Sequence, residues 1–319
     1  MQTLVTGATG FIGRRLLQPM DRALVRRKSN LTNEVIGDLL DPRTLKAACK
    51  DIDTVFHCAG YSQASQSSDP DIHWGVNYEG TKNLLDAAIE ERVSQFIYLS
   101  SVKAMAEPGD QCVQEGWPGE PATEYGKAKR SAERLVLEAG KKHGMRVTVL
   151  RLAMVYGRGG RGNMEKMGRW VEKGLFPPLP ETGNKRSIVH VEDVIDAVHL
   201  VASKPEANGR TYIIADARAY SGREIYDAIR EQLGKKVCTW SVPSFALKLG
   251  GVAGDFIETL AHSSLPLNSE VIDRLLRSSC YSPALIEEEL GWRANIGLDA
   301  GLQEMLGINS TLSKLDHES

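Results

Sequence analysis

The sequence predicts an α/β fold: a Rossmann-type doubly wound parallel sheet, joined to a smaller, mostly helical C-terminal region. Two observations carry this prediction. In the first half, short β-rich runs alternate with helical patterns, as expected for βαβ units. Directly after the first run stands a glycine-rich stretch, TGATGFIG at 6–13. In a sheet of this type, that position is a turn from the first strand into the first helix.

Six β-rich runs are predicted to be strands, and they lie at 3–5, 23–25, 35–36, 54–58, 96–99 and 147–150. Helical patterns separate them, near 11–18, 43–50, 72–92 and 125–143. Right-handed crossovers between parallel strands place such helices on both faces of the sheet. Ile213-Ile214 is expected to add one more strand to the same sheet, and helical patterns dominate from 221 onward.

The expected domain organisation follows from this pattern. Residues 1–160 form the nucleotide-binding domain, to which 187–216 returns. Residues 161–186 and 217–309 form the substrate-binding region, and 310–319 are a polar tail.

Composition narrows the class of protein. The formal net charge is −2, so we expect neither nucleic acid nor a membrane surface as a partner. No window approaches a membrane span, and no secretion signal begins the chain. The five cysteines include no C-x-x-C pair, which argues against a disulfide framework or a metal site and favours a cytoplasmic location.

The glycines at 7, 10 and 13 have separate expected roles. Gly7 allows the sharp turn out of the strand, Gly10 lets backbone approach a diphosphate, and Gly13 lets the helix pack closely on the sheet. The helix N-terminus then offers free N–H groups to phosphate oxygens. The stretch therefore predicts a dinucleotide-binding loop.

The identity of the dinucleotide is read from the end of the second strand. A carboxylate there binds the ribose hydroxyls of NAD, whereas an arginine pairs with the 2′-phosphate of NADP. Arg26 and Arg27 occupy this region and no acidic residue lies between Arg22 and Asn33. NAD or NADP is expected, with NADP favoured.

Tyr125 and Lys129 are four residues apart at the start of a helical pattern, so they share a helix face. A nearby lysine cation favours the phenolate, which makes tyrosine a usable proton acceptor near neutral pH. Ser101 ends the fifth strand, where parallel sheets place ligand sites. These three residues predict acid–base chemistry on a hydroxyl group.

Taken in order, these and further motifs resemble the extended short-chain dehydrogenase/reductases, and within them the NAD-dependent epimerase/dehydratase family of UDP-glucose 4-epimerase-like proteins and 4-keto-sugar reductases. The further motifs are Gly37-Asp38-Leu39, His57-Cys58-Ala59-Gly60, Val76-Asn77, LRLAMVYGRGG at 150–160, and the run at 185–194.

The resemblance implies roles for individual residues. It implies a catalytic triad of Ser101, Tyr125 and Lys129, with Ser101 also touching substrate. It implies substrate contacts at Asn163, which starts a helix, and at Arg186, which meets a nucleotide diphosphate. It also implies a homodimer. In addition to the contacts already expected for Arg26, Tyr125 and Lys129, it implies cofactor contacts at Gly7, Gly10, Phe11, Ile12, Gly13, Asp38, Leu39, Ala59 and Gly60.

Two departures from the family pattern separate the possible reactions. Sugar dehydratases carry an Asp-Glu pair after the catalytic hydroxyl, but Val102 and Lys103 stand here, which disfavours dehydration. Epimerases keep an acidic residue after the second strand, whereas Arg26 and Arg27 stand here. A 4-epimerase of a UDP-sugar is the leading expectation, and an NADPH-dependent reductase of a 4-keto sugar nucleotide is the alternative. A 3β-hydroxysteroid-type dehydrogenase and a non-catalytic NADP sensor rank lower.

The remaining candidates are read as structural. His57 and His190 share no metal-like spacing with other ligands, and Asp193 is expected to orient local backbone. Neither Cys58 nor Cys112 is a predicted nucleophile. The aromatic residues Tyr220, Tyr226 and Trp240 are assigned to core packing by default.

Overall fold

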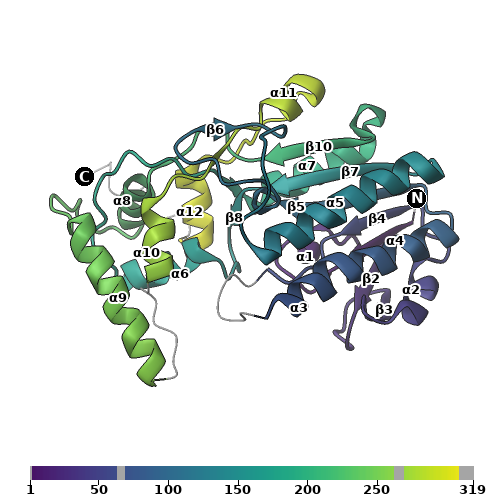
Figure 1. The fold of residues 1–319 in the computed structure, drawn as a ribbon, viewed down its shortest axis with the longest axis horizontal. Helices are drawn as coiled ribbons and strands as arrows, with labels where there is room; N and C mark the ends of the chain where they lie inside the picture. Colours follow the sequence, from purple (N-terminus) through teal and green to yellow (C-terminus); the bar gives the residue numbers. More distant parts are fainter. Residues whose placement is uncertain (1, 63–68, 262–268, 309–319) are drawn as a thin grey trace, which may run out of the picture.

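A computed structural model describes residues 2–62, 69–261 and 269–308, without the side chains of 253–261 and Glu270 (Figure 1). The expected tail at 310–319 lies outside the described residues. The molecule is elongated, with a parallel sheet and its helices at one end and a helical region at the other.

The central sheet has seven parallel strands in the order β10-β7-β5-β4-β1-β2-β3. Their bounds are β1 Thr3–Thr6, β2 Arg22–Val25, β3 Glu34–Ile36, β4 Thr54–His57, β5 Gln95–Ser101, β7 Arg146–Leu152 and β10 Arg210–Ile214. Central strands such as β4 and β7 are buried along nearly their whole length, as expected of a parallel sheet covered on both faces. The prediction of a Rossmann-type sheet is confirmed, including the strand at Ile213-Ile214.

Helices cover both faces of this sheet. One hydrophobic core cluster contains Leu45, Leu84 and Ala132, which come from α2 (Pro42–Cys49), α4 (Gly80–Glu90) and α5 (Glu124–His143). The other contains Leu16 and Val194, from α1 (Gly13–Leu16) and α7 (Val191–Ser203), together with Ile286 of α11 (Ala284–Leu290).

Two of the predicted helices differ from expectation. α1 covers only Gly13–Leu16. The backbone becomes extended at Leu17, and Pro19 disfavours a helical conformation of the residue that precedes it. The helix expected near 72–92 begins at Pro70 and contains three parts: α3 (Pro70–His73), a π-helical segment η1 (Trp74–Glu79) and α4. Wide π-helical turns often mark functional sites.

The helical region encloses a third core cluster, which contains the buried rings of Tyr156, Tyr220 and Tyr226. Its helices are α6 Asn163–Glu172, α8 Gly222–Gln232, α9 Ser244–Ala261, α10 Ser269–Leu276 and α12 Leu298–Leu306. Two-stranded sheets, β8 (Met154–Tyr156) with β9 (Ile188–His190) and β6 (Cys112–Val113) with β11 (Cys280–Tyr281), connect it to the rest. Short 3-10 turns are η2 Val102–Ala104 and η3 Pro205–Ala207.

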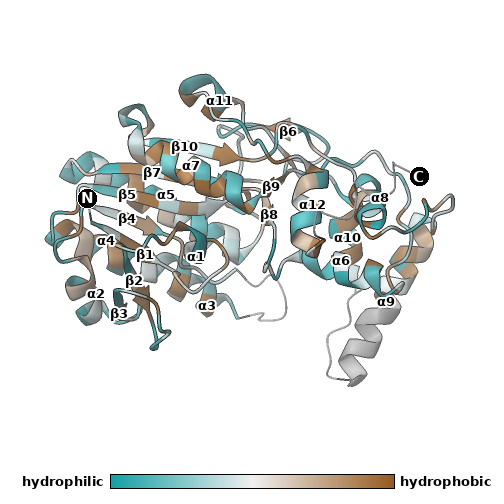
Figure 2. Ribbon diagram, turned by 180° about the vertical axis from the view of Figure 1, so that it is seen from behind, coloured by the Kyte–Doolittle hydropathy of each residue, from teal (hydrophilic) through white to brown (hydrophobic). Residues whose placement is uncertain are grey.

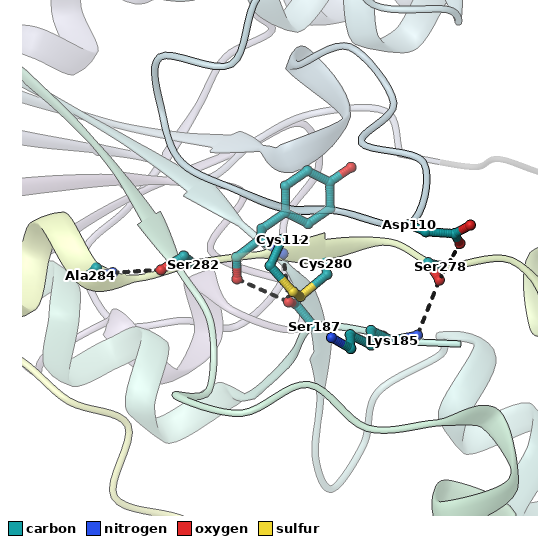
Figure 3. Close-up of a disulfide and its surroundings, with 9 residues drawn as sticks. Asp110, Cys112, Lys185, Ser187, Ser278, Cys280, Ser282 and Ala284 are labelled. Carbon is teal, nitrogen blue, oxygen red and sulfur yellow. Dashed lines mark hydrogen bonds between the residues drawn. A yellow bond between two sulfur atoms is a disulfide. The ribbon is translucent and has the colours of Figure 1, made fainter. Parts of the chain in front are cut away.

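A disulfide joins Cys112 to Cys280, which corrects the expectation that the cysteines form no bridge (Figure 3). The two residues are opposite each other in the β6–β11 pair, with their Cα atoms 4.5 Å apart. Their separation of 168 residues explains why spacing in the sequence gave no signal. Hydrogen bonds around the bridge join the same segments: Ser278 donates to Asp110 over 3.0 Å, and the Ser187 hydroxyl binds both backbone groups of Tyr281.

Among the described residues, no helix combines the length and the apolar character that crossing a membrane requires.

Candidate active site

The glycine loop lies where β1 and β4 end side by side. Gly7 has φ +66°, and a Cβ there would lie 2.8 Å from the backbone nitrogen of Ala59, so only glycine allows the two strand ends to approach. A Cβ at Gly13 would collide with the Gly7 carbonyl, which already accepts a 2.8 Å hydrogen bond from the Gly10 N–H. This close backbone cradle fits a dinucleotide diphosphate.

The loop after β4 is held by side chains of the helical run. The Asn77 amide in η1 both accepts from the Tyr61 N–H, over 2.9 Å, and donates to the Tyr61 carbonyl, over 3.0 Å. The Thr6 hydroxyl accepts from the Ala59 N–H over 3.1 Å. Asn77 thus holds Tyr61, which directly follows Gly60, and Thr6 holds Ala59; the Val76-Asn77 motif did not indicate this role.

His57 is structural, as predicted. Its buried ring lies between the hydroxyls of Thr6 and Thr81, at 2.7 and 2.9 Å. Burial, together with the Lys129 charge, lowers the pKa of His57 to about 3, so the ring stays neutral.

The part of the expected cofactor site that would hold the adenosine is exposed to solvent. Arg26 and Arg27 follow β2 directly and both are exposed. Asp38 follows β3 and accepts from the Leu40 N–H over 2.9 Å. The neighbouring Leu39 side chain is buried, and its carbonyl accepts from Asn83 over 2.8 Å.

Phe11 and Ile12 lie in the glycine-rich stretch just before α1, which Ile12 precedes directly. The Arg15 guanidinium lies over the Phe11 ring, 4.8 Å from its centroid, and Ile12 packs against the core beneath the sheet. Their expected cofactor contacts stay a prediction.

Ser101 and Tyr125 meet at the carboxyl end of β5. α5 begins beside Tyr125 because the Thr123 side chain caps it by accepting from the Gly126 N–H over 3.1 Å. Burial raises the pKa of Tyr125, and a hydrogen bond with the Ser101 hydroxyl acts in the opposite direction. The His73 ring contacts the Tyr125 ring edge-on, with centroids 5.7 Å apart.

Lys129 lies one turn further along α5 and is buried. Its ammonium group donates to the Leu99 carbonyl over 2.7 Å and lies 4.2 Å from the centroid of the Tyr98 ring. Burial lowers the pKa of Lys129 to about 7. A Cβ at Gly60 would lie 4.0 Å from the Lys129 Nζ atom, so the ammonium borders the expected cofactor loop.

A buried ion pair supports this arrangement from below. Glu133, one turn beyond Lys129, pairs with Arg151 of β7 at 2.7 Å and accepts from the Ser100 hydroxyl over 2.5 Å. The Glu133 charge raises the pKa of Lys129 and so opposes the effect of burial. Residue spacing alone did not identify this pair as part of the site.

A cavity of about 620 Å³ brings four of the predicted site residues together, whereas Lys129 and the glycine loop are not part of its lining. Its lining includes Ser101, Tyr125, Asn163 and Arg186, all of which were predicted to touch substrate. Asn163 is the first residue of α6, as the resemblance implied. The lining also contains two cations that the sequence did not single out, Arg274 and Arg277.

Arg186 is held in place by the end of α10. Its guanidinium donates to the carbonyls of Arg274 and Arg277, and its backbone pairs with that of Tyr220. These contacts join residues about ninety positions apart, which is why spacing could not have predicted the three-arginine cluster. The cluster supplies positive charge suited to a diphosphate.

The cavity wall after Ser101 has no acid in the position that dehydration would need. Val102 and Lys103 stand there, and the Lys103 ammonium pairs with Glu107 at 3.3 Å. Glu124 also lines the cavity, but hydrogen bonds from Lys127 and Trp74 lower its pKa, so it stays ionised.

The other candidates have structural explanations. Asp193 accepts from the N–H groups of Asn295 and Ile296, which fixes a distant segment instead of the local backbone we expected. Burial raises the pKa of Cys58 to about 12, which makes it a poor nucleophile.

In the part of the chain that the structure describes, no group of three or more potential ligands could hold a metal ion. Trp240 contradicts its assignment to the core, because 62% of it is exposed.

The fold and this constellation define a class, the extended short-chain dehydrogenase/reductases, which use NAD(P). A family model, the NAD dependent epimerase/dehydratase family, matches residues 3–215, and the chain belongs to that family. It is 28% identical to a UDP-glucose 4-epimerase of Vibrio cholerae, over 94% of this chain and 93% of the relative.

Two further relatives cover nearly the whole chain. An N-acetyl-alpha-D-glucosaminyl-diphospho-ditrans,octacis-undecaprenol 4-epimerase of Escherichia coli O157:H7 is 24% identical over 98% of this chain and 96% of its own. Among solved structures, MoeE5 in complex with UDP-glucuronic acid and NAD aligns with a TM-score of 0.76 at 25% identity, covering 96% of this chain and 98% of its own. The chain is therefore an NAD(P)-dependent enzyme of this family.

Proposed function

We propose that the protein is a 4-epimerase of a nucleotide sugar, with a UDP-sugar as substrate. The observation that carries the proposal is the shared cavity, in which the phenol of Tyr125 and the guanidinium of Arg186 line one space of about 620 Å³. An acid–base group and a diphosphate-binding cation are the two things that chemistry at a sugar hydroxyl of such a substrate requires. The relatives named as 4-epimerases support this reading.

Each residue has a part in the proposed reaction. Tyr125 takes the proton from the C4 hydroxyl and later returns it, while Ser101 hydrogen-bonds the same oxygen and orients it. Lys129 borders the cofactor loop and would hold the nicotinamide ribose. Bound NAD(P) would supply the nicotinamide needed for reversible hydride transfer at C4. Gly7, Gly10 and Gly13 would hold its diphosphate.

We assign substrate binding to residues on the other side of the cavity. Arg186, with Arg274 and Arg277, binds the substrate diphosphate, and Asn163 contacts the substrate from the start of α6. Val102 and Lys103 supply no carboxyl group at the two positions where sugar dehydratases carry one, so water elimination is not proposed.

A reductase that consumes NADPH is the second candidate, and the Arg26–Arg27 pair favours it. Both side chains are exposed directly after β2, where the 2′-phosphate of NADP would lie. In that reaction hydride is delivered once and Tyr125 supplies one proton.

One assay separates these functions. Purified protein is mixed with UDP-glucose, UDP-N-acetylglucosamine and a 4-keto-6-deoxy sugar nucleotide, and both sugar interconversion and absorbance at the nicotinamide band are followed. An epimerase interconverts sugars without net loss of cofactor, whereas a reductase consumes NADPH in proportion to product. Tyr125→Phe is expected to lower turnover about 10²- to 10⁴-fold with cofactor affinity retained. Full turnover by this variant would refute the acid–base role.

We also propose a homodimer in which α4 and α5 of two copies pair, an arrangement that the family resemblance supports. Light scattering at several protein concentrations tests it, and a monomer at all of them would contradict it.

A further inference from the structure

We propose that one face of the helical region binds the surface of a bilayer containing anionic lipids. The face is formed by Val237, Trp240, Phe245, Leu249 and Val252, which we call the apolar patch. Each of these side chains is at least 61% exposed. Among the described residues, ten large hydrophobic side chains are exposed, and half of them gather in this single stretch.

Within residues 244–252, whose side chains the structure describes, the helix that carries most of the patch has apolar residues on its outer side as well as its inner side. Phe245, Leu249 and Val252 follow one another at spacings of four and three, which places them on one face of α9. Leu247 and Gly251 are buried, and Leu247 packs into the third core cluster. A surface helix normally presents polar residues to water, so the outer face of α9 calls for a partner.

The charges beside the patch indicate which partner. Lys236 and Lys248 are exposed, and between Glu231 and Asp255 the only charged residues of the sequence are these two and Lys235. Lys235 is already engaged, since it donates to the Glu172 carbonyl over 2.9 Å. Apolar side chains with an aromatic residue and a rim of lysines are typical of segments that lie in the interface of an anionic membrane.

These charges also argue against a second copy of the chain as the partner. A two-fold contact brings the same patch of both copies together, so the lysines of one copy would face the lysines of the other. The overall charge of −2 led us to expect no lipid partner, but that sum averages over the whole chain and conceals this local excess of lysine.

The position of the patch is compatible with catalysis at a lipid surface. α9 lies at the end of the molecule furthest from the outer strands β2 and β3 and packs beside α10 (Figure 1). Its described turns are partly brown on the hydropathy scale (Figure 2). Because Arg274 of α10 and the following Arg277 line the substrate cavity, a protein bound through α9 would hold that cavity near the lipid surface.

Vesicle flotation tests the proposal with the full-length protein. Vesicles of phosphatidylcholine with phosphatidylglycerol are expected to carry the protein upward, pure phosphatidylcholine vesicles much less, and added salt should weaken the binding. The triple variant Phe245→Ser/Leu249→Ser/Val252→Ser should lose at least about tenfold in partitioning, and Lys236→Glu/Lys248→Glu should lose binding to the anionic vesicles selectively.

The matched control is Met20→Ser, which removes an equally exposed apolar side chain from the other end of the molecule and should leave flotation unchanged. Thermal unfolding verifies that the variants remain folded. Two outcomes would overturn the proposal. One is a folded wild-type protein that does not bind anionic vesicles; the other is a wild-type oligomer that the triple serine variant dissociates, which would make the patch a contact between copies.

Discussion

The half that we expect to bind the nucleotide and the helical region, which we propose as the substrate region, are held together in different ways. The sheet of the first half is a series of parallel ladders between neighbouring strands, and helices connect most of its consecutive strands. The substrate region depends on a few links between distant segments, such as Cys112–Cys280 and Asp193 with Asn295. This difference leads us to expect two kinds of effect. A substitution should destabilise the first half by leaving a buried group without its partner, and the second half by breaking a single contact between distant segments.

The largest expected effect is in the first half, at the buried ion pair. Glu133→Gln leaves the Arg151 guanidinium buried without an opposing charge, which should cost about 3–5 kcal/mol of the free energy of unfolding. Urea denaturation measures this. The control is Glu120→Gln, whose partner Arg134 is exposed, and its cost should stay below about 1 kcal/mol. Equal losses in the two variants would contradict the role of burial.

Breaking the disulfide probes the second half. Cys112→Ser/Cys280→Ser releases a link across 168 residues and should cost about 2–5 kcal/mol of stability. Because Ser278, Ser279 and Tyr281 beside the bridge line the cavity, the KM for the sugar substrate should rise while the Kd for the cofactor stays constant. Dithiothreitol should reproduce both effects in the wild type and change nothing in the variant. Equal weakening of both ligands would contradict the separation of the two halves.

The buried lysine gives the first half a pH dependence. Burial lowers the folded-state pKa of Lys129 from 10.5 to about 7. Below pH 7 the lysine is therefore charged in the folded protein and destabilises it to the full extent. That cost diminishes as the pH rises from 7 toward 10.5, because the folded protein then releases a proton that the unfolded chain retains. Between pH 7 and 8.5 the wild type should gain roughly 1–2 kcal/mol relative to Lys129→Met, measured by denaturant midpoints. Parallel pH profiles would contradict this assignment.

The smallest effect is expected at the open adenosine end, where contacts are exposed. Arg26→Ala/Arg27→Ala should weaken NADPH binding about tenfold and leave NADH binding unchanged, as measured by fluorescence titration. Lys28→Ala, next to the pair, serves as the control and should change neither. A wild type that binds NADPH and NADH equally would remove the basis for favouring NADP.

The same contrast explains what the sequence predicted well. The six strands that the first half contributes to the central sheet were predicted within about two residues, because period, turn residues and order are local signals, whereas the short strands β6 and β8 were not predicted. Ser101 follows from its position, since a parallel sheet brings its strand ends to one edge, and Tyr125 follows from its four-residue spacing to Lys129 in a helical pattern. The stop of α1 before Pro19 was a local signal that the prediction of a helix to residue 18 overlooked.

The substrate side was harder to predict because its contacts are not local. Arg186 meets Arg274 and Arg277 only after the chain has folded back, and neither of those two residues belongs to a motif. Cys112 and Cys280 are brought together in the same way. Trp240 was assigned to the core from residue type alone, and burial depends on neighbours that the sequence does not reveal.

The most direct test of the central claim is a crystal structure with NAD(P) and a UDP-sugar bound. The account predicts the Tyr125 hydroxyl within hydrogen-bond reach of the C4 oxygen, roughly 2.6–3.2 Å, with the sugar diphosphate on the guanidinium of Arg186. A substrate whose C4 oxygen lies far from that hydroxyl, or whose diphosphate binds elsewhere, would contradict it.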